Sequence, residues 1–201
     1  MVGALALWSI VVMAVVGNPL RLVEILGGGA TLRPVIDSII LAESSGCVNA
    51  KNELSTALGP GQFLNQTWLE LIRAYRPDLA RAGEAEVLEL RRDRQLAREM
   101  TMRFAERNSS FLQTRGVPVT PGSVYLSHFA GPAGAVALLT ASDELDAATV
   151  MAKADATGRT TREEIVRANP FLGQFTVGDL KRWADGKTQR TSRNGAVPRQ
   201  C

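Results

Sequence analysis

From Thr31 onward the chain follows helical spacing, with capping residues, prolines and glycines recurring every 10 to 20 residues or so. No run of residues alternates convincingly between apolar and polar side chains, as a half-buried strand would. This pattern predicts an all-α domain with at most a minimal β element. The chain has 201 residues, enough for one such domain with short appendages and a sizeable core. It contains no internal repeat that would build a helical solenoid.

Start and stop signals predict where the individual helices lie. Prolines fit the first turn of a helix, and Asp or Thr side chains accept hydrogen bonds from the first free amides. Pro77 is expected to end a helix, and Asp93 is expected to divide a long helical stretch by capping its second half. We expect helices over 34–44, from 65 or 67 to 76, over 84–112 in two parts, over 120–129 and 132–139, and after two capping boxes formed by Thr160 with Glu163 and Thr176 with Asp179.

The N-terminal segment is apolar over residues 4–16, interrupted only by Ser9. This length suits the core of a signal peptide and falls short of the membrane span of about 20 residues. We therefore expect export, with an uncleaved membrane anchor as the alternative because no Lys or Arg precedes the run. The expected organisation is a signal peptide or anchor with a Gly-rich joint over 1–30, a compact helical domain over 31–186, and a disordered basic tail over 187–201.

The net charge of +3 is unevenly distributed along the chain. Residues 1–185 carry 19 Lys and Arg against 20 Asp and Glu, and four basic residues with no acid follow. The helical domain is thus nearly neutral, and we expect no nucleic-acid partner. The tail is expected to hold the domain near anionic surfaces, an effect that salt weakens. No metal-ligand cluster, nucleotide fingerprint or phosphate loop occurs, so neither a metal nor a cofactor is expected.

Glu43 occupies an unusual position for an acid. It lies four residues after Ile39 and seven after Ile36, on the apolar face of the first expected helix. A carboxyl group there is partly withdrawn from water, which raises its pKa toward the range useful for a general acid. The alternative is a carboxylate at a frayed helix end, turned into the loop that begins at Ser45. Periodicity alone weighs the two equally.

The loop after Glu43 is rich in uncharged polar side chains between Gly46 and Thr67. Amide and hydroxyl groups of this kind suit the hydroxyl and acetamido groups of a sugar, and Phe63 and Trp68 offer apolar surface for its ring faces. An ordinary turn-rich loop beside a core Trp is the alternative, and composition alone favours it.

Three short blocks then occur in order. Residues 42–46 are Ala-Glu-Ser-Ser-Gly, residues 59–62 are Gly-Pro-Gly-Gln, and residues 127–132 are Ser-His-Phe-Ala-Gly-Pro. Over about residues 32–187 the chain resembles the soluble lytic transglycosylases, exported bacterial enzymes that cleave peptidoglycan. Asn169-Pro170 and the segment through Trp183 and Lys187 resemble the C-terminal helix of the branch whose third motif is Tyr-Leu-x-His-Phe. The resemblance implies a lysozyme-like helical fold and a periplasmic location.

The resemblance also implies roles for individual residues. Glu43 would be the single catalytic acid, cleaving the bond between N-acetylmuramic acid and N-acetylglucosamine to give a 1,6-anhydro product. Ser55 and Gln62 would position Glu43 or the sugar amides, with Phe63 as an apolar sugar contact. Most relatives place Tyr-Asn where this chain has His128 and Phe129, so Tyr125 or His128 would contact the saccharide. Packing of His128 in the core is an equal alternative.

Two other functions stay open at this point. A hydrolytic muramidase of the same fold needs a second carboxylate to direct water, and Glu53 is the nearby candidate, although an exposed loop acid beside Lys51 is the favoured interpretation. The other is a non-catalytic module that binds the wall or takes part in assembling a secretion apparatus. Partners would be peptidoglycan strands, the membrane through the N-terminal segment, and secretion or wall-assembly proteins.

The two cysteines point to no catalytic thiol, since no His lies beside either of them in the sequence. A buried or inert Cys47 is the favoured interpretation. A disulfide between Cys47 and Cys201 in an oxidising compartment is the alternative.

Overall fold

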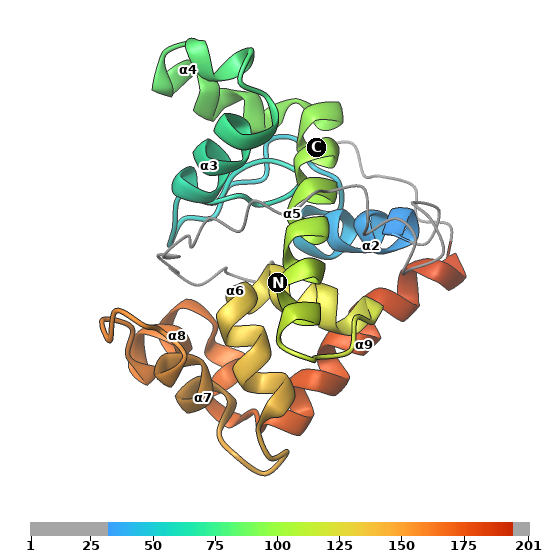
Figure 1. The fold of residues 1–201 in the computed structure, drawn as a ribbon, viewed down its shortest axis with the longest axis vertical. Coiled ribbons are helices and arrows are strands. Elements are labelled where there is room, and N and C mark those ends of the chain that lie inside the picture. The colour runs from blue at the N-terminus through green and yellow to red at the C-terminus, as the bar shows by residue number, and fades with distance from the viewer. Residues whose placement is uncertain (1–31, 195–201) are drawn as a thin grey trace.

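The computed structural model describes residues 32–194, with side chains to residue 189, and this part of the chain is all-α (Figure 1). The extended backbone forms only isolated bridges there, two of them in the loop between α2 and α3. The predicted fold class, all-α with a minimal β element, is confirmed. The helices are α2 (Leu32–Ser44), α3 (Asn65–Tyr75), α4 (Glu84–Glu89), α5 (Arg94–Thr114), α6 (Pro121–Thr140), α7 (Ala147–Lys153), α8 (Arg162–Ala168) and α9 (Val177–Asn194).

Three sequence predictions fall on residues outside this range. The apolar run over 4–16, the Gly-rich joint and Cys201 all lie outside the described residues. Cys47 lies within them: it is half-buried and disulfide-bonded, so the interpretation of a buried or inert thiol is wrong. Between Leu32 and Asn194, no helix combines the length and the apolar character needed to cross a bilayer.

Most of the predicted caps are present. The Asp93 side chain accepts a hydrogen bond from the Leu96 amide at 2.8 Å and begins α5. Thr176 and Asp179 form the expected reciprocal pair at the start of α9. The capping box predicted at Thr160 and Glu163 is wrong by one residue, because Thr161 and Glu164 form it. The Thr160 amide instead donates to Asp155 at 2.9 Å, which keeps Thr160 in the preceding loop.

Helix α6 contains the bend that the sequence predicted between two helices. Gly131 has φ 71° and ψ 162°, which is not helical, and Pro132 follows with no amide hydrogen to donate. The helices expected over 120–129 and 132–139 are therefore the two halves of one kinked element. Its first half carries Tyr125 and His128, both buried.

The described residues form two hydrophobic cores. The larger core joins α2, the later part of α5, and α6 to α9; the smaller one joins α3, α4 and the first part of α5. Figure 1 shows α3 and α4 at one end of the molecule, α7 and α8 at the other, and α5 running between them. The loop over 45–64 leads from α2 in the large core to Phe63 in the small one.

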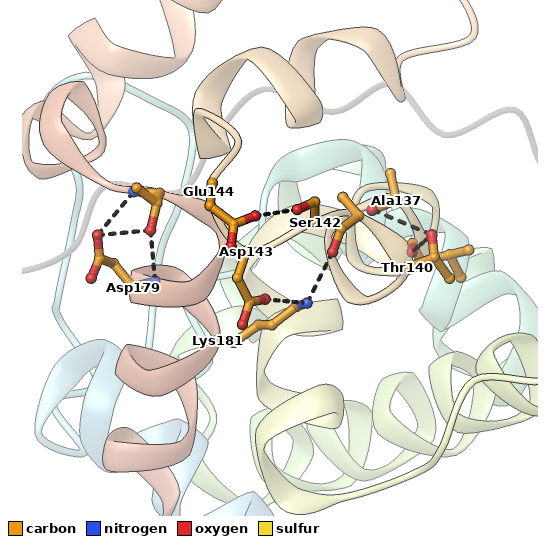
Figure 2. Close-up of polar contacts among 10 residues, drawn as sticks. Ala137, Thr140, Ser142, Asp143, Glu144, Asp179 and Lys181 are labelled. Carbon is orange, nitrogen blue, oxygen red and sulfur yellow. Dashed lines mark hydrogen bonds and ion pairs between the residues drawn. The ribbon is translucent and has the colours of Figure 1, made fainter.

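Helix α9 is fixed at its start to the loop between α6 and α7 (Figure 2). The Lys181 ammonium donates to Asp143 at 2.8 Å and to the Ala141 carbonyl at 3.2 Å. The Val177 amide donates to the Leu145 carbonyl at 2.8 Å. These contacts set the direction in which α9 runs along α6 and α2.

The predicted disordered tail over 187–201 is wrong for residues 187–194, which continue α9. Thr188 is buried, and its carbonyl accepts a hydrogen bond from the Ser38 hydroxyl of α2 at 3.4 Å. Packing against α2 therefore extends the helical domain beyond the boundary that composition indicated at residue 186.

Candidate active site

The end of α2 is tied directly to the second sequence block. The buried Ser44 hydroxyl lies 2.9 Å from the Pro60 carbonyl and 3.2 Å from the Ile40 carbonyl, and it accepts from the Gly46 amide at 3.0 Å. Ser45 and Gly46 both have positive φ, which ends the helix in a tight turn. Ser44 thus fixes the backbone on which Glu43 sits. Sequence reasoning assigned it no role, although the first block contains it.

A buried arginine holds the loop between the blocks. Arg91 donates from Nη1 to the carbonyls of Thr56 (2.7 Å) and Phe63 (3.0 Å) and to the Asn65 side chain (2.8 Å). Gly59 is required beside it, because its φ is 77° and a Cβ there would lie 2.0 Å from the Arg91 carbonyl oxygen. Nothing in the sequence distinguishes Arg91, because it lies in an Arg-rich stretch that otherwise resembles a solvated surface.

Gln62 and Ser55, the two predicted positioning residues, organise the loop itself. Gln62 is buried at φ 47°, and its Nε2 donates to the carbonyls of Ala50 and Gly59, each at 2.9 Å. Its Oε1 has no hydrogen-bond partner among the described residues. The half-buried Ser55 hydroxyl accepts from the Ala57 amide at 3.2 Å. No hydrogen bond to Glu43 from either side chain is present within residues 32–189.

Glu43 lies in the core, only 3% exposed, as its position on the apolar face predicted. The Tyr125 hydroxyl donates a hydrogen bond to Glu43 Oε1 at 3.2 Å. Burial raises the pKa of Glu43 from 4.5 to about 7, while the Tyr125 hydrogen bond and the charge of Lys187 act in the opposite direction. Near neutral pH, both the acid and the carboxylate are therefore populated. The alternative of a frayed, solvent-facing carboxylate is wrong.

Tyr125 supplies a phenol beside the acid. It is buried, and its ring centroid lies 5.4 Å from that of Trp183 on α9. Burial and the negative charge of Glu43 raise the pKa of Tyr125 above its ordinary value, so the hydroxyl stays protonated. Tyr125 is therefore a constant hydrogen-bond donor to Glu43.

His128 is packed among aromatic side chains and is 8% exposed. Its ring centroid lies 5.7 Å from that of Phe63 and 5.5 Å from that of Phe104. Burial lowers the pKa of His128 from 6.5 to about 4, so the ring is neutral at neutral pH. The structure packs His128 in the core, as the alternative had it, and the predicted contact of His128 with a saccharide stays a prediction.

Phe63 belongs to the same aromatic cluster. It is buried, with its ring centroid 5.6 Å from that of Trp68 and 6.0 Å from that of Phe104. Trp68 is also buried and donates from Nε1 to the Val87 carbonyl at 2.7 Å. The alternative of a core Trp holds for Trp68, and the sugar contact expected of Phe63 stays a prediction. Together they fill the small core.

Trp183 and Lys187 of α9 also lie at the site, although the sequence placed Lys187 in the disordered tail. The Lys187 ammonium lies 5.2 Å from the centroid of the Trp183 ring, and Trp183 in turn packs against Tyr125. Both side chains are half-buried. The signal that could have found the pair is their spacing of four residues on one helix face.

Other titratable groups do not converge here. Glu53, the candidate second carboxylate, is exposed in the loop. Over residues 32–194 no group of three or more His, Cys, Asp and Glu side chains comes together as a set of metal ligands. What the arrangement offers chemically is one buried carboxyl that exchanges a proton near pH 7, with a fixed hydroxyl donor and a nearby cation.

In comparisons with known proteins, no family model matches this chain and the search of curated proteins gives no match.

Proposed function

We propose that the protein is a lytic transglycosylase that cleaves the β-1,4 bond between N-acetylmuramic acid and N-acetylglucosamine in peptidoglycan without water. The observation that carries the proposal is the buried Glu43 carboxyl, with a pKa of about 7 and a hydrogen bond from Tyr125. The three sequence blocks support it, because a family resemblance derived from them picks out the same carboxyl as the acid.

The first step is general acid catalysis. Protonated Glu43 donates its proton to the glycosidic oxygen, and the bond between that oxygen and C1 of the muramoyl residue breaks. The carbonyl oxygen of the muramoyl N-acetyl group stabilises the cationic C1. The substrate thus supplies the group that a second enzyme carboxylate supplies in most glycosidases.

The second step reverses the role of Glu43. Its carboxylate accepts the proton of the C6 hydroxyl, O6 forms a bond to C1, and the 1,6-anhydro ring closes as the acetamido oxygen leaves. Glu43 ends protonated, so no water or other reactant is consumed. Between the two steps the Tyr125 hydroxyl stabilises the carboxylate by donating to it.

A pKa near 7 suits both steps, because one group must give a proton and then take one. Burial alone would hold Glu43 protonated and make it a poor base. Tyr125 and Lys187 stabilise the ionised form and bring the two forms closer in free energy. The unpartnered Oε1 of Gln62 is suited to accept from the N–H of a sugar acetamido group, and this contact is part of the proposal.

The test is digestion of purified peptidoglycan with mass analysis of the fragments, for the wild type and for Glu43→Gln. We expect the wild type to release muropeptides one water lighter than those with reducing ends, and Glu43→Gln to release almost none. Thermal unfolding of both proteins checks that the substitution leaves the fold intact. Products with reducing ends would exclude the non-hydrolytic mechanism.

Two alternatives have less support. A hydrolytic muramidase needs a second carboxylate near Glu43, but Glu53 is exposed and the charged group that acts on Glu43 is the cation Lys187. A wall-binding module without activity has no need of a buried carboxyl held near neutrality. In the proposed setting the enzyme works in the periplasm on glycan strands, beside wall-assembly or secretion proteins, and the N-terminal apolar segment directs export or anchors it at the membrane.

A further inference from the structure

An ammonium group without an ionic partner lies beside the proposed catalytic acid. Among residues 32–189 no ion pair involves Lys187, which is half-buried on α9. Its neighbours on the same helix differ: Lys181 pairs with Asp143 at 2.8 Å and Arg182 pairs with Asp179 at 2.8 Å. Lys187 is thus a cation of α9 that forms no ion pair with the described residues, although its charge favours the ionised form of Glu43.

The position of Lys187 is fixed by its surroundings. Its Nζ lies 5.2 Å from the Trp183 ring centroid, a cation–π contact that holds the flexible side chain. The Trp183 ring packs against Tyr125, whose hydroxyl binds Glu43. Thr188, the next residue, is fixed to α2 through its carbonyl. Two adjoining side chains, Trp183 and Tyr125, therefore connect the ammonium to the proposed catalytic carboxyl.

Neither Asp185 nor the protonated form of Glu43 neutralises Lys187. Asp185 lies two residues earlier, a spacing at which helix side chains point in different directions. Its carboxylate lies against Gly122, where a Cβ would come within 1.8 Å of Asp185 Oδ1. Glu43 is neutral in the state that donates a proton. A half-buried cation without a partner favours an incoming anion.

We infer that Lys187 binds a carboxylate carried by the lactyl substituent of the muramoyl residue and thereby selects that residue over N-acetylglucosamine. This inference rests on the proposed function, and it names what the site recognises. Of the two sugars that flank the bond, only the muramoyl residue carries an acidic substituent. The carboxylate is the lactyl carboxylate itself in strands without peptides, or a carboxylate of the stem peptide in strands that carry them.

The experiment compares three glycan strands of matched length: peptide-bearing strands, strands freed of peptides, and peptide-free strands whose lactyl carboxylates have been converted to amides. The variants are Lys187→Met, Lys187→Arg and the control Lys153→Met, which removes an equal charge from an exposed position on α7. The readouts are kcat/KM for anhydro products and Kd for each strand in the Glu43→Gln background.

We expect the wild type to prefer strands with a carboxylate over amidated strands by about 10-fold or more, as a hydrogen bond to a charged group implies. Lys187→Met should remove this preference, Lys187→Arg should keep most of it, and Lys153→Met should match the wild type. Preference for peptide-free acidic strands identifies the lactyl carboxylate, and preference confined to peptide-bearing strands identifies the stem.

The ratio between strands separates recognition from acid strength. Loss of Lys187 also raises the pKa of Glu43, but that change affects every strand equally and cancels in the ratio. In the wild type the same ratio should fall as salt rises, a measurement that stays decisive if Lys187→Met does not fold.

Equal ratios in the wild type and Lys187→Met, or a wild-type ratio of one, would overturn the inference while leaving the proposed function intact. Absence of anhydro products from all strands would instead overturn the proposed function, and the Kd ratios would still decide the role of Lys187. Absence of binding to any strand would overturn both.

Discussion

Two regions of this domain bury an ionisable side chain to nearly the same extent, with different results. Glu43 is 3% exposed and His128 is 8% exposed, and in each case burial disfavours the charged form. Glu43 has a hydroxyl donor in Tyr125 and a cation in Lys187, whereas His128 lies between the rings of Phe63 and Phe104 and has a backbone hydrogen bond at Gly61 that favours its charged form. Burial outweighs these partners in both regions: it brings the carboxyl to a pKa of about 7, where it exchanges a proton near neutral pH, and it takes the imidazole to a pKa of about 4, where the ring stays neutral.

The largest expected effect on activity comes from removing the carboxyl group of Glu43. Glu43→Gln should lower the rate of anhydro-product release by at least about 1,000-fold, because one carboxyl serves as both acid and base. Glu53→Gln is the matched control, because Glu53 is an exposed acid of the loop after α2 and its variant should keep full activity. If the two variants lost activity equally, Glu53 would be the second carboxylate of a hydrolytic site and the contrast between Glu43 and His128 would lose its meaning.

The second expected effect is on the free energy of unfolding, which Glu43 and His128 should make depend on pH in opposite directions. The pKa of Glu43 is raised in the folded state, so its contribution to stability is present below pH 4.5 and is lost as pH rises toward 7. The pKa of His128 is lowered in the folded state, so its contribution to stability is present above pH 6.5 and is lost as pH falls toward 4. Between pH 4.5 and 6.5 the two opposite slopes of stability against pH should therefore nearly cancel.

Single substitutions should expose each slope. The free energy of unfolding of Glu43→Gln, relative to wild type, should rise with pH by up to about 1.4 kcal/mol per pH unit, reaching about 3 kcal/mol above pH 7. For His128→Phe the relative slope should have the opposite sign and similar size. Denaturant unfolding at half-unit intervals from pH 4 to 8 measures both. Asp146, whose pKa Arg162 lowers to about 2, titrates below this range. Parallel curves for both variants and the wild type would contradict the two shifts.

The local parts of this arrangement could be predicted from the sequence. The core-facing position of Glu43 followed from its spacing to Ile36 and Ile39, and the caps at Asp93 and Thr176 followed from short polar patterns. Each depends on neighbours within a few residues. The capping box at Thr161 was misplaced because Asp155, five residues before Thr160, binds that residue's amide.

The long-range parts could not be predicted. Arg91 lies in a stretch of alternating charges, and only the fold shows that it binds backbone carbonyls from Thr56 and Phe63. Phe63 follows the second sequence block, which suggested a sugar contact, but the small core covers it. Lys187 has a tail-like sequence context and is recruited by packing of α9 on α2. In all three cases tertiary contacts decided between a surface and a buried position.

A smaller effect on activity is expected when Glu43 is kept and its hydrogen-bond donor Tyr125 is removed. Tyr125→Phe removes the hydrogen bond to Oε1, which should lower kcat by about 10- to 100-fold, since a hydrogen bond to a charged group is lost. It should also raise the pKa of Glu43, so the fall of kcat/KM at high pH should move to higher pH. Tyr75→Phe, at the end of α3, is the matched control. An unshifted pH profile in Tyr125→Phe would show that the hydroxyl does not act on the acid.

The smallest effect on activity should come from the other region. His128→Phe keeps an aromatic ring between Phe63 and Phe104 and removes the imidazole nitrogens. We expect kcat/KM to change by less than about threefold and stability at pH 7 by about 1 kcal/mol, the size of one neutral hydrogen bond. A neutral ring whose pKa is about 4 has no proton to exchange near pH 7, so the pH profile should not move. A large loss of activity with the fold intact would place His128 in contact with the saccharide, as the family resemblance first suggested. Both Glu43 and His128 would then be needed for activity, Glu43 for proton transfer and His128 for binding, and the aromatic cluster would form part of the substrate site.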